Sequence, residues 1–353
     1  MLAAALLALA PQAAPTPSDG GLVERRLAAM GTWLEVTVQA ADRATALAAS
    51  EAAVRAIEAC EARLSTWRED SELARLNAAP LADWRELSPE LADELERARA
   101  LWQATEGAFD PGLGALVEAW GLRSGGRQPA AEELAEALGA RGFAGFTLEG
   151  RRAMRHHPQA RIEEGGFGKG LGLDQALRAL RAAGGRVARL DLGGQVLVHG
   201  AEQAIELADP DQRERALLAL TLDSGSLATS GNSERGIVVD GERRGHLLDP
   251  RSGAPAPDFG SLTVWAADAF TADALSTGLY VLGPERALAW QAAARAGGPR
   301  PEGPACELLL LLRTERGPRA VVTAGLRPRV RALVPGLEIE LAPHPSHSLF
   351  TRK

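Results

Sequence analysis

The stretch IEEGGFGKGLGLD at Ile162–Asp174 places five glycines and one lysine at the start of a segment with helical spacing. Glycines allow backbone N–H groups to approach a ligand closely, and the start of a helix carries a partial positive charge. Lys169 adds a full positive charge. The stretch therefore predicts a phosphate-binding loop that leads into a helix over Leu171–Ala182.

This stretch differs from two common nucleotide-binding patterns. A Walker A loop has Ser or Thr after its lysine, whereas Gly170 follows Lys169 here. The glycine spacing from Gly166 to Gly172 is GxGxGxG, which is not the dinucleotide pattern GxGxxG. Glycine-rich segments also join strands to helices without binding a ligand. The pattern by itself leaves phosphate binding and a structural connection as alternatives.

The composition is that of a globular protein, with 353 residues, 46% hydrophobic content and a formal net charge of -7. This length is sufficient to bury one large core or two medium ones. The negative charge, without a basic run interleaved with aromatics, argues against nucleic-acid binding. Cys60 and Cys306 lack CxxC spacing, so we expect buried core residues and no zinc site or disulfide framework.

The N-terminal residues 1–20 contain an apolar run with an Ala-x-Ala-like end, which indicates a signal peptide and export. An alanine-rich tail is the alternative, because no early Lys or Arg precedes the run. No later run reaches 18 apolar residues, so we expect no transmembrane span. Residues 21–345 are predicted to form a single domain, followed by a tail at 346–353.

The hydrophobic periodicity predicts a mixed α/β fold. Helices are expected at Asp42–Leu64, from Ser88 onward, and at Pro129–Leu138, Leu171–Ala182, Ala272–Leu279 and Pro284–Ala294. Strands are expected at Thr32–Val38, Arg186–Asp191, Val196–His199, Ala204–Leu207, Gly236–Val239, Leu262–Ala266 and Leu308–Leu312.

A second chemical cluster lies in the predicted helix near Ala272–Leu279. Asp273 and Thr277 are four residues apart, so a helix presents their carboxylate and hydroxyl on one face. Oxygen ligands of this kind, completed by a backbone carbonyl and phosphate oxygens, suit Mg²⁺ better than zinc. The alternative makes Asp273 an ordinary first-turn charge and Thr277 a hydroxyl that bonds back to the helix.

A third cluster is RGHLLDPRSGAP at Arg244–Pro255, where Pro250 and Gly253 predict a tight turn after a strand. Such a turn can hold His246 and Arg251 toward a ligand, with His246 as a general base or a hydrogen-bond donor. A single histidine is more often structural, so this interpretation depends on its neighbours.

Nine short motifs connect these clusters in one order along the chain. They are MGT (30–32), STWREDSELARLN (65–77), GAFDPG (107–112), WG (120–121), GGFGKGLGLD (165–174), LDLGG (190–194), ATSGN (228–232), HLLDPRSGAP (246–255) and ADALST (272–277). Over roughly Ala28–Leu282 this ordered set resembles the FAD:protein FMN transferase, or ApbE-like, family, formerly called thiamine biosynthesis lipoproteins. The resemblance implies a T-fold-related α/β architecture with two intimately packed subdomains.

The resemblance also implies an activity. Family members cleave FAD at its pyrophosphate with Mg²⁺, attach FMN to a Ser or Thr hydroxyl of a target redox protein, and release AMP. The expected partners are FAD and an acceptor flavoprotein on the periplasmic side of the bacterial inner membrane. Two alternatives stay open, namely a Mg²⁺-dependent FAD pyrophosphatase and a non-catalytic flavin-binding protein.

The resemblance assigns roles to individual residues. Its magnesium ligands correspond to Gly166, through a backbone carbonyl, and to Asp273 and Thr277. Its catalytic groups correspond to His246, Asp273 and Lys169. The FAD-binding positions correspond to Met30, Trp67, Ala108, Phe109, Asp110, Glu163, Lys169, His246 and Leu247.

The chain departs from the family pattern beside the lysine loop. Members commonly carry Asp-Leu where Glu163 and Glu164 stand here. Glu163 can still accept a hydrogen bond from the dinucleotide, whereas Glu164 adds negative charge near a pyrophosphate unless it points away or meets an arginine. Trp67 replaces a common tyrosine, which preserves an aromatic ring for stacking.

Overall fold

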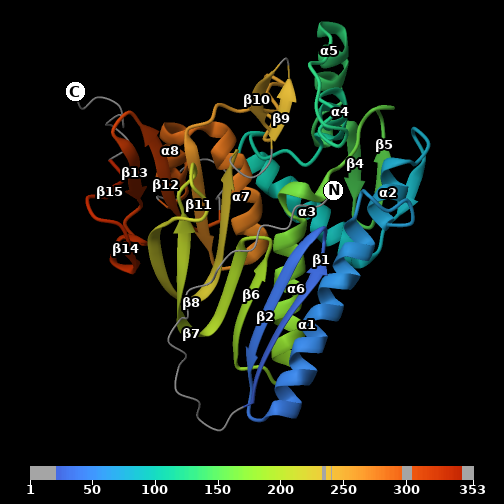
Figure 1. The fold of residues 1–353 in the computed structure, drawn as a ribbon. Helices are drawn as coiled ribbons and strands as arrows, with labels where there is room; N and C mark the ends of the chain where they lie inside the picture. The colour runs from blue at the N-terminus through green and yellow to red at the C-terminus, as the bar shows by residue number, and fades with distance from the viewer. Residues whose placement is uncertain (1–20, 233–235, 240, 296–303, 344–353) are drawn as a thin grey trace.

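The computed structural model describes residues 21–232, 236–239, 241–295 and 304–343. Figure 1 shows a large twisted sheet whose helices gather mainly behind it and at its upper end. The proposed leader at 1–20 and tail at 346–353 lie outside the described residues. The single-domain assignment of 21–345 stays a prediction.

Ten strands form the main sheet in the described part of the chain, in the order β1-β2-β6-β7-β8-β11-β12-β13-β15, with β14 paired to β8. The pairs are antiparallel except β13 with β15. The strands are β1 (Leu22–Ala29), β2 (Thr32–Gln39), β6 (Val187–Leu192), β7 (Gln195–Ala208), β8 (Ala216–Gly231), β11 (Gly260–Ala266), β12 (Cys306–Thr314), β13 (Gly317–Val322), β14 (Val330–Ala332) and β15 (Ile339–Leu341).

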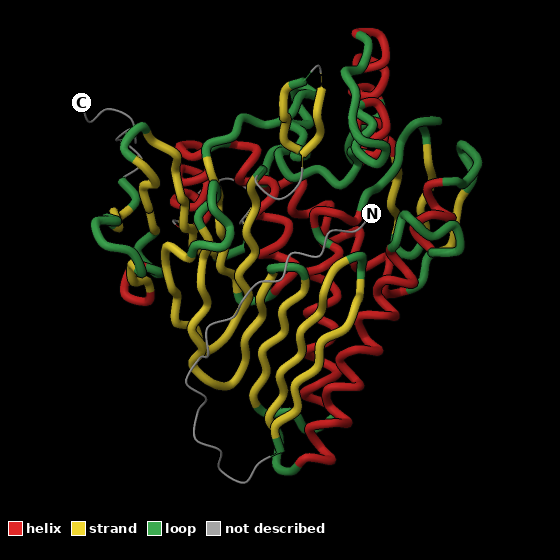
Figure 2. The backbone as a smooth tube through the Cα atoms, viewed as in Figure 1, coloured by secondary structure: helices red, strands yellow, loops and turns green. Residues whose placement is uncertain are grey.

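The remaining elements within the described ranges are eight α-helices, two small sheets and three short 3₁₀ helices at Phe143–Gly145, Glu164–Gly166 and Arg327–Arg329. The helices are α1 (Arg43–Leu64), α2 (Glu72–Asn77), α3 (Pro89–Ala104), α4 (Gly114–Ala119), α5 (Ala131–Gly139), α6 (Gly168–Ala182), α7 (Ala269–Leu282) and α8 (Pro284–Arg295). One small sheet joins β3 (Trp84–Glu86), β5 (Arg152–Arg155) and β4 (Phe146–Glu149), and β9 (Gly236–Val239) pairs with β10 (Glu242–Gly245). Figure 2 shows the resulting mixture of helix and strand, which confirms the predicted α/β class.

Capping side chains fix the predicted starts of two scaffold helices. Asp42 accepts a hydrogen bond from Thr45 N at 2.7 Å at the start of α1, and Ser88 accepts one from Leu91 N at 3.2 Å at the start of α3. Each cap satisfies a backbone donor that has no partner inside its helix. The local sequence therefore determines both boundaries.

Strand β12 shows how the sheet is buried on both faces. Its run CELLLLLRT is apolar without alternation, as expected of a strand covered on both sides. Leu308, Leu310 and Leu312 pack in the central core with α7 and α8, whereas Leu309 and Leu311 pack on the opposite face with β7 and β13. Cys60 and Cys306 are both buried, which confirms the prediction that they are core residues.

Two apolar clusters place α6 and α7 beside each other under the sheet. Leu173, Ala176 and Leu180 of α6 pack with α1 and with strands β2 and β6. Phe270 and Leu275 of α7 pack in the larger core, which extends to the small β3-β5-β4 sheet. The first turns of these two helices therefore meet in the interior.

The structure corrects several predicted elements, among them α7, which begins at Ala269 rather than at Ala272. Helix α6 begins at Gly168, three residues earlier than predicted, so Lys169 lies in the first helical turn. The predicted strands Val196–His199 and Ala204–Leu207 are one strand, β7, because both halves pair with β8 across an irregularity after His199. Strand β8 was not predicted.

A separate apolar cluster joins α4 and α5 to the β9-β10 hairpin at the upper end of the molecule (Figure 1). Ile237 and Val239 of β9 pack there with Leu116 and Trp120. Gly126 has φ +94° and lies directly under Ile237, where a Cβ would come within 2.3 Å of the Ile237 Cβ. This contact requires glycine and ties the hairpin to the loop after α4.

Candidate active site

The centre of the site is an ion pair between α6 and α7. Lys169 Nζ donates to the two carboxylate oxygens of Asp273 at 3.1 and 3.4 Å. Gly170 N donates to Asp273 Oδ2 at 2.9 Å. Asp273 is buried with 3% exposure, whereas the Lys169 side chain keeps 30% of its surface exposed. The first turn of α6 therefore presents a lysine and one backbone amide toward a buried carboxylate.

Glycines allow the two helices to come this close. A Cβ on Gly170 would lie 2.3 Å from the Ala269 carbonyl oxygen and 2.7 Å from Phe270 Cα. A Cβ on Gly278 would lie 2.7 Å from Phe109 Cβ. Because these neighbours include backbone atoms, they cannot move aside cheaply. Gly170 and Gly278 are therefore needed for the packing of α6 and α7.

Two of the predicted metal-ligand residues adjoin each other. A Cβ on Gly166 would lie 3.6 Å from Thr277 Oγ1 and 3.5 Å from the ring of Phe109. Thr277 is half-buried on the same face of α7 as Asp273. Residues Gly166, Asp273 and Thr277 thus come from two segments that meet around Lys169.

These residues fit a hard cation. The donors are a carboxylate, a hydroxyl and a backbone carbonyl, which are the oxygen ligands that Mg²⁺ takes alongside phosphate oxygens. Among the described residues no cluster of three His, Cys, Asp or Glu side chains could hold a metal by itself. A single carboxylate suits a Mg²⁺ that is shared with a phosphorylated ligand.

The GAFDPG segment pairs with the chain just before the loop. Glu163 N donates to Pro111 O at 2.8 Å, and Gly114 N donates to Arg161 O at 3.2 Å. Asn77 closes the other side, because its side chain donates to Ile162 O at 2.9 Å and accepts from Ile162 N at 2.8 Å. These bonds hold the start of the loop from both sides.

Ala108 and Phe109 lie behind this site. Both are buried, and the Phe109 ring packs edge-to-face on Phe167 with ring centroids 6.5 Å apart. The Phe109 ring also adjoins Gly166. A direct contact between Ala108 or Phe109 and FAD stays a prediction.

Asp110 holds its own turn. Its Oδ1 accepts from Gly112 N at 2.7 Å, and a Cβ on Gly142 would lie 3.2 Å from its Oδ2. Burial raises the pKa of the Asp110 carboxyl to about 6, and the hydrogen bond from Gly112 and the charge of Arg141 oppose that rise. The contact of Asp110 with FAD stays a prediction.

Asp110→Asn is expected to flatten the pH dependence of stability. The folded-state pKa of about 6 exceeds the ordinary aspartate value, so the carboxyl favours folding below about pH 4 and loses that contribution as pH rises through 6. Asparagine stays neutral and can still accept from Gly112 N. The free energy of unfolding of the variant minus that of wild type should therefore be about 1–3 kcal/mol larger at pH 7 than at pH 4.

Chemical denaturation of wild type and Asp110→Asn at several pH values between 4 and 7 measures this difference. The matched control is Asp93→Asn, which changes an exposed aspartate on α3. If the stability curves of wild type and Asp110→Asn run parallel across this range, the assigned pKa is wrong.

The two glutamates that depart from the family pattern both have partners. Glu163 forms an ion pair with Arg123, and its side chain is only 19% exposed. Glu164 accepts from Thr66 Oγ1 at 2.7 Å and from Thr66 N at 3.2 Å. The pKa of the Glu163 carboxyl is raised overall, chiefly by burial and also by the negative charge of Glu164. The positive charge of Arg123 opposes this rise. Arginine thus meets Glu163, while a threonine binds Glu164.

Met30 lies against the glycine face of α6. Met30 and Gly31 form the two-residue turn between β1 and β2, with φ values of +48° and +71°. Glu61 holds this turn, because its carboxylate accepts from Met30 N at 3.0 Å. A Cβ on Gly172 would lie 3.3 Å from Met30 Sδ. The thioether therefore packs on the helix that carries Lys169.

His246 and Leu247 follow β10 and connect two cores. Leu247 packs on the central core, and the next residue, Leu248, packs in the upper cluster. His246 is half-buried. Arg251, which the sequence placed toward a ligand, instead forms an ion pair with Asp249 inside the turn at 2.7 Å. That turn is also held by Trp120 of the WG motif, whose indole N–H donates to Gly253 O at 2.6 Å.

The ATSGN segment contacts α7 at Ser276, beside the predicted metal ligand Thr277. Ser230 Oγ lies 2.9 Å from Ser276 Oγ, and Ser276 Oγ donates to Asp273 O at 2.9 Å. Asn232 donates to Tyr280 Oη at 3.2 Å further along the helix. These bonds fix α7 against the end of β8.

Sequence reasoning missed Glu61, Asn77 and Arg123 as contributors to the site. Asn77 ends a quoted motif, so its place in that motif was a usable signal. Glu61 and Arg123 act only through residues distant in sequence. No local pattern distinguishes them from surface charges.

The fold and the site define an α/β protein in which a lysine-bearing helix start and an oxygen-donor face converge, an arrangement suited to a phosphorylated ligand and a hard cation. The profile of the ApbE family matches residues 30–297. The chain belongs to the ApbE family.

Curated relatives and solved structures agree with this assignment. The chain is 32% identical to the FAD:protein FMN transferase of Haemophilus influenzae over 279 residues, which are 73% of this chain and 80% of that protein. An ApbE protein of Thermotoga maritima superposes with a TM-score of 0.77 at 30% identity, covering 88% of this chain and 99% of that one. The flavin transferase ApbE of Vibrio cholerae gives 0.74 at 27% identity, with 88% and 99% covered.

Proposed function

We propose that this chain is a FAD:protein FMN transferase that uses Mg²⁺ to cleave FAD and attach FMN to a Ser or Thr hydroxyl of an acceptor protein. The name of the relatives supports the enzyme class. The observation that carries the proposal is the meeting of Lys169, Asp273, Thr277 and Gly166 at the first turn of α6.

The reaction forms one bond and breaks one. The acceptor hydroxyl oxygen bonds to the phosphorus of the FMN half, the bond from that phosphorus to the bridging oxygen breaks, and AMP leaves with that oxygen. The hydroxyl proton passes to a base, for which His246 is the candidate. A Mg²⁺ held by Asp273, Thr277 and the Gly166 carbonyl would neutralise charge on the pyrophosphate.

The residues of the chain supply position and charge. Lys169 has three N–H donors, so it can hold Asp273 and a phosphate oxygen together. The first N–H groups of α6 lack partners inside the helix, which favours an anion at this end. Phosphoryl transfer depends largely on such positioning and electrostatic stabilisation.

Incubating the purified protein with FAD, with Mg²⁺ or EDTA, and with or without an acceptor domain carrying a Ser/Thr flavinylation site tests the proposal. We expect AMP release and flavin covalently attached to the acceptor, both dependent on Mg²⁺. AMP and free FMN without attachment would make the protein a pyrophosphatase. Intact FAD under all metal conditions would contradict both enzymatic functions and favour a non-catalytic flavin-binding protein.

Export to the periplasmic side of the inner membrane, where the acceptor would be a redox protein, is also part of the proposal. It depends on residues 1–20, which lie outside the described residues. Across the residues that the structure describes, no helix is both long enough and apolar enough to span a bilayer.

A further inference from the structure

The arginine that meets Glu163 also covers an exposed tryptophan. The Arg123 guanidinium lies over the Trp67 ring at 4.5 Å from its centroid, within the range of a cation–π contact. The same guanidinium pairs with Glu163 and donates to Thr66 O at 3.2 Å. One side chain therefore joins the Trp67 segment to the start of the lysine loop.

Trp67 keeps 70% of its surface exposed even though Arg123 lies over its ring. An indole ring with this exposure is available to stack on another aromatic ring. Glu163 lies in the loop segment that leads to Gly166, and a Cβ on Gly114 would lie 3.2 Å from its Oε1. Arg123 thus links the exposed ring to Glu163, which lies three residues before Gly166 in the loop.

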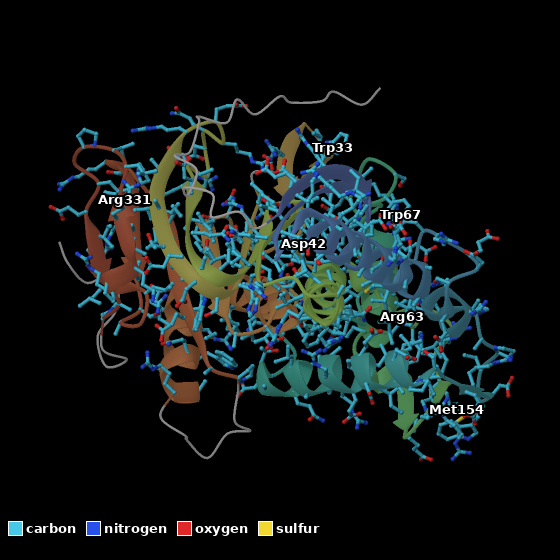
Figure 3. The ribbon with its side chains drawn as sticks, turned by 90° about the horizontal axis from the view of Figure 1, so that it is seen from below. Trp33, Asp42, Arg63, Trp67, Met154 and Arg331 are labelled. Carbon is cyan, nitrogen blue, oxygen red and sulfur yellow. The ribbon has the colours of Figure 1, made fainter. Side chains whose placement is uncertain are left out.

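A second tryptophan serves as a comparison. Arg26 lies 4.8 Å over the ring of Trp33, and it also pairs with Glu35 at 3.4 Å. Trp33 is 53% exposed, so this group repeats the same chemistry on the β1-β2 hairpin. Its Arg26 and Glu35 side chains are 60% and 43% exposed, against 33% for Arg123 and 19% for Glu163. Figure 3 shows Trp33 and Trp67 at separate places on the molecule.

The two ion pairs, Arg26 with Glu35 and Arg123 with Glu163, differ in how far their side chains are buried. An exposed pair such as Arg26 with Glu35 contributes little, because water screens both charges. Glu163 is largely buried, so removal of Arg123 would leave its charge without compensation beside an anionic ligand. Both arginines contact a tryptophan and a glutamate. Loss of Arg123 should nevertheless be the more damaging, because only Glu163 is largely buried.

We propose that Arg123 is a positioning residue of the FAD site, which neutralises Glu163 and holds the Trp67 indole in place to stack on an aromatic ring of the dinucleotide. This inference rests on the proposed function, because it takes FAD as the ligand. Arg123 acts through Trp67 and Glu163 and takes no part in the bond changes at phosphorus.

The test measures FAD affinity separately from turnover. The Kd for FAD is measured in EDTA by flavin fluorescence, and kcat and KM are measured with Mg²⁺ by AMP release. Arg123→Ala should raise Kd and KM about 10- to 30-fold while kcat stays within about twofold, because binding loses a cation–π contact and gains an unpaired charge. Arg123→Lys keeps the charge without the flat guanidinium, so its Kd should rise only about threefold.

A second change separates charge from folding damage. In the double variant Arg123→Ala/Glu163→Gln the unpaired charge is gone, so its Kd should return to within about threefold of Glu163→Gln alone. Arg26→Ala is the matched control and should leave Kd, KM and kcat unchanged. Competition by FMN and by AMP identifies the stacked ring, because Arg123→Ala should weaken whichever competitor carries that ring.

Three results would overturn the inference. They are an Arg123→Ala Kd equal to that of Arg26→Ala, no recovery in the double variant, and unchanged competition by both FMN and AMP. A wild-type protein that does not bind FAD would instead refute the proposed function. A wild type that binds and cleaves FAD while Arg123→Ala behaves like Arg26→Ala would refute only the role of Arg123.

Discussion

Asp273→Asn is expected to reduce Mg²⁺-dependent FAD cleavage at least about a hundredfold. The amide oxygen can still accept from Gly170 N, so the packing of α6 on α7 is retained. The variant lacks the negative charge that holds Lys169 and that would hold a cation. Activity should therefore fall much more than stability.

AMP release at saturating Mg²⁺ measures the activity, and thermal unfolding measures the stability. Asp174→Asn is the matched control, since Asp174 is also buried at this helix junction and accepts from Ala269 N at 2.7 Å and Phe270 N at 3.1 Å. It should lower Tm more than Asp273→Asn while keeping most activity. An Asp273→Asn enzyme that retains more than about a tenth of wild-type turnover would remove Asp273 from the metal site.

Gly170→Ala is expected to separate the two helices that form the site. The new methyl group would lie 2.3 Å from the Ala269 carbonyl oxygen, so backbone must move. Alanine is the better helix former, but this gain of about 1 kcal/mol is smaller than the cost of overpacking. We expect a net loss of roughly 2–4 kcal/mol in the free energy of unfolding, together with loss of FAD cleavage.

Gly165→Ala provides the matched control five residues earlier in the same stretch. A Cβ on Gly165 has no neighbour within 4 Å, so its effect on stability should stay within about 0.5 kcal/mol. Urea denaturation and AMP release on both variants check the prediction. Equal stability of Gly165→Ala and Gly170→Ala would show that the close contact of α6 with α7 is not required.

Sequence patterns predicted the starts of α1 and α3 correctly but missed strand β8. The caps at Asp42 and Ser88 act within one helical turn, so their boundaries could be located without tertiary structure. Strand β8 combines an apolar run with a polar segment around Asp223–Gly225, and such a run does not distinguish strand from helix. Its pairing with β7, β11 and β14 decides its conformation.

The site could be predicted only in its components. The spacing of Asp273 and Thr277 follows from helical geometry, and the glycine stretch is visible as a pattern. The start of α6 at Gly168 was missed because glycines usually favour loops over helix interiors. This first turn is helical because it packs closely on the start of α7, where a side chain at position 170 would not fit.

The sequence by itself determined the α/β class, the cap-defined helix starts, the helical face shared by Asp273 and Thr277, and the resemblance to a flavin transferase family. Only the tertiary structure decided that Lys169 pairs with Asp273, 104 residues away, and that Arg123 compensates Glu163. Periodicity and capping reflect interactions within a few residues, which a linear pattern records. Pairing of distant charges depends on helix packing that no local pattern contains.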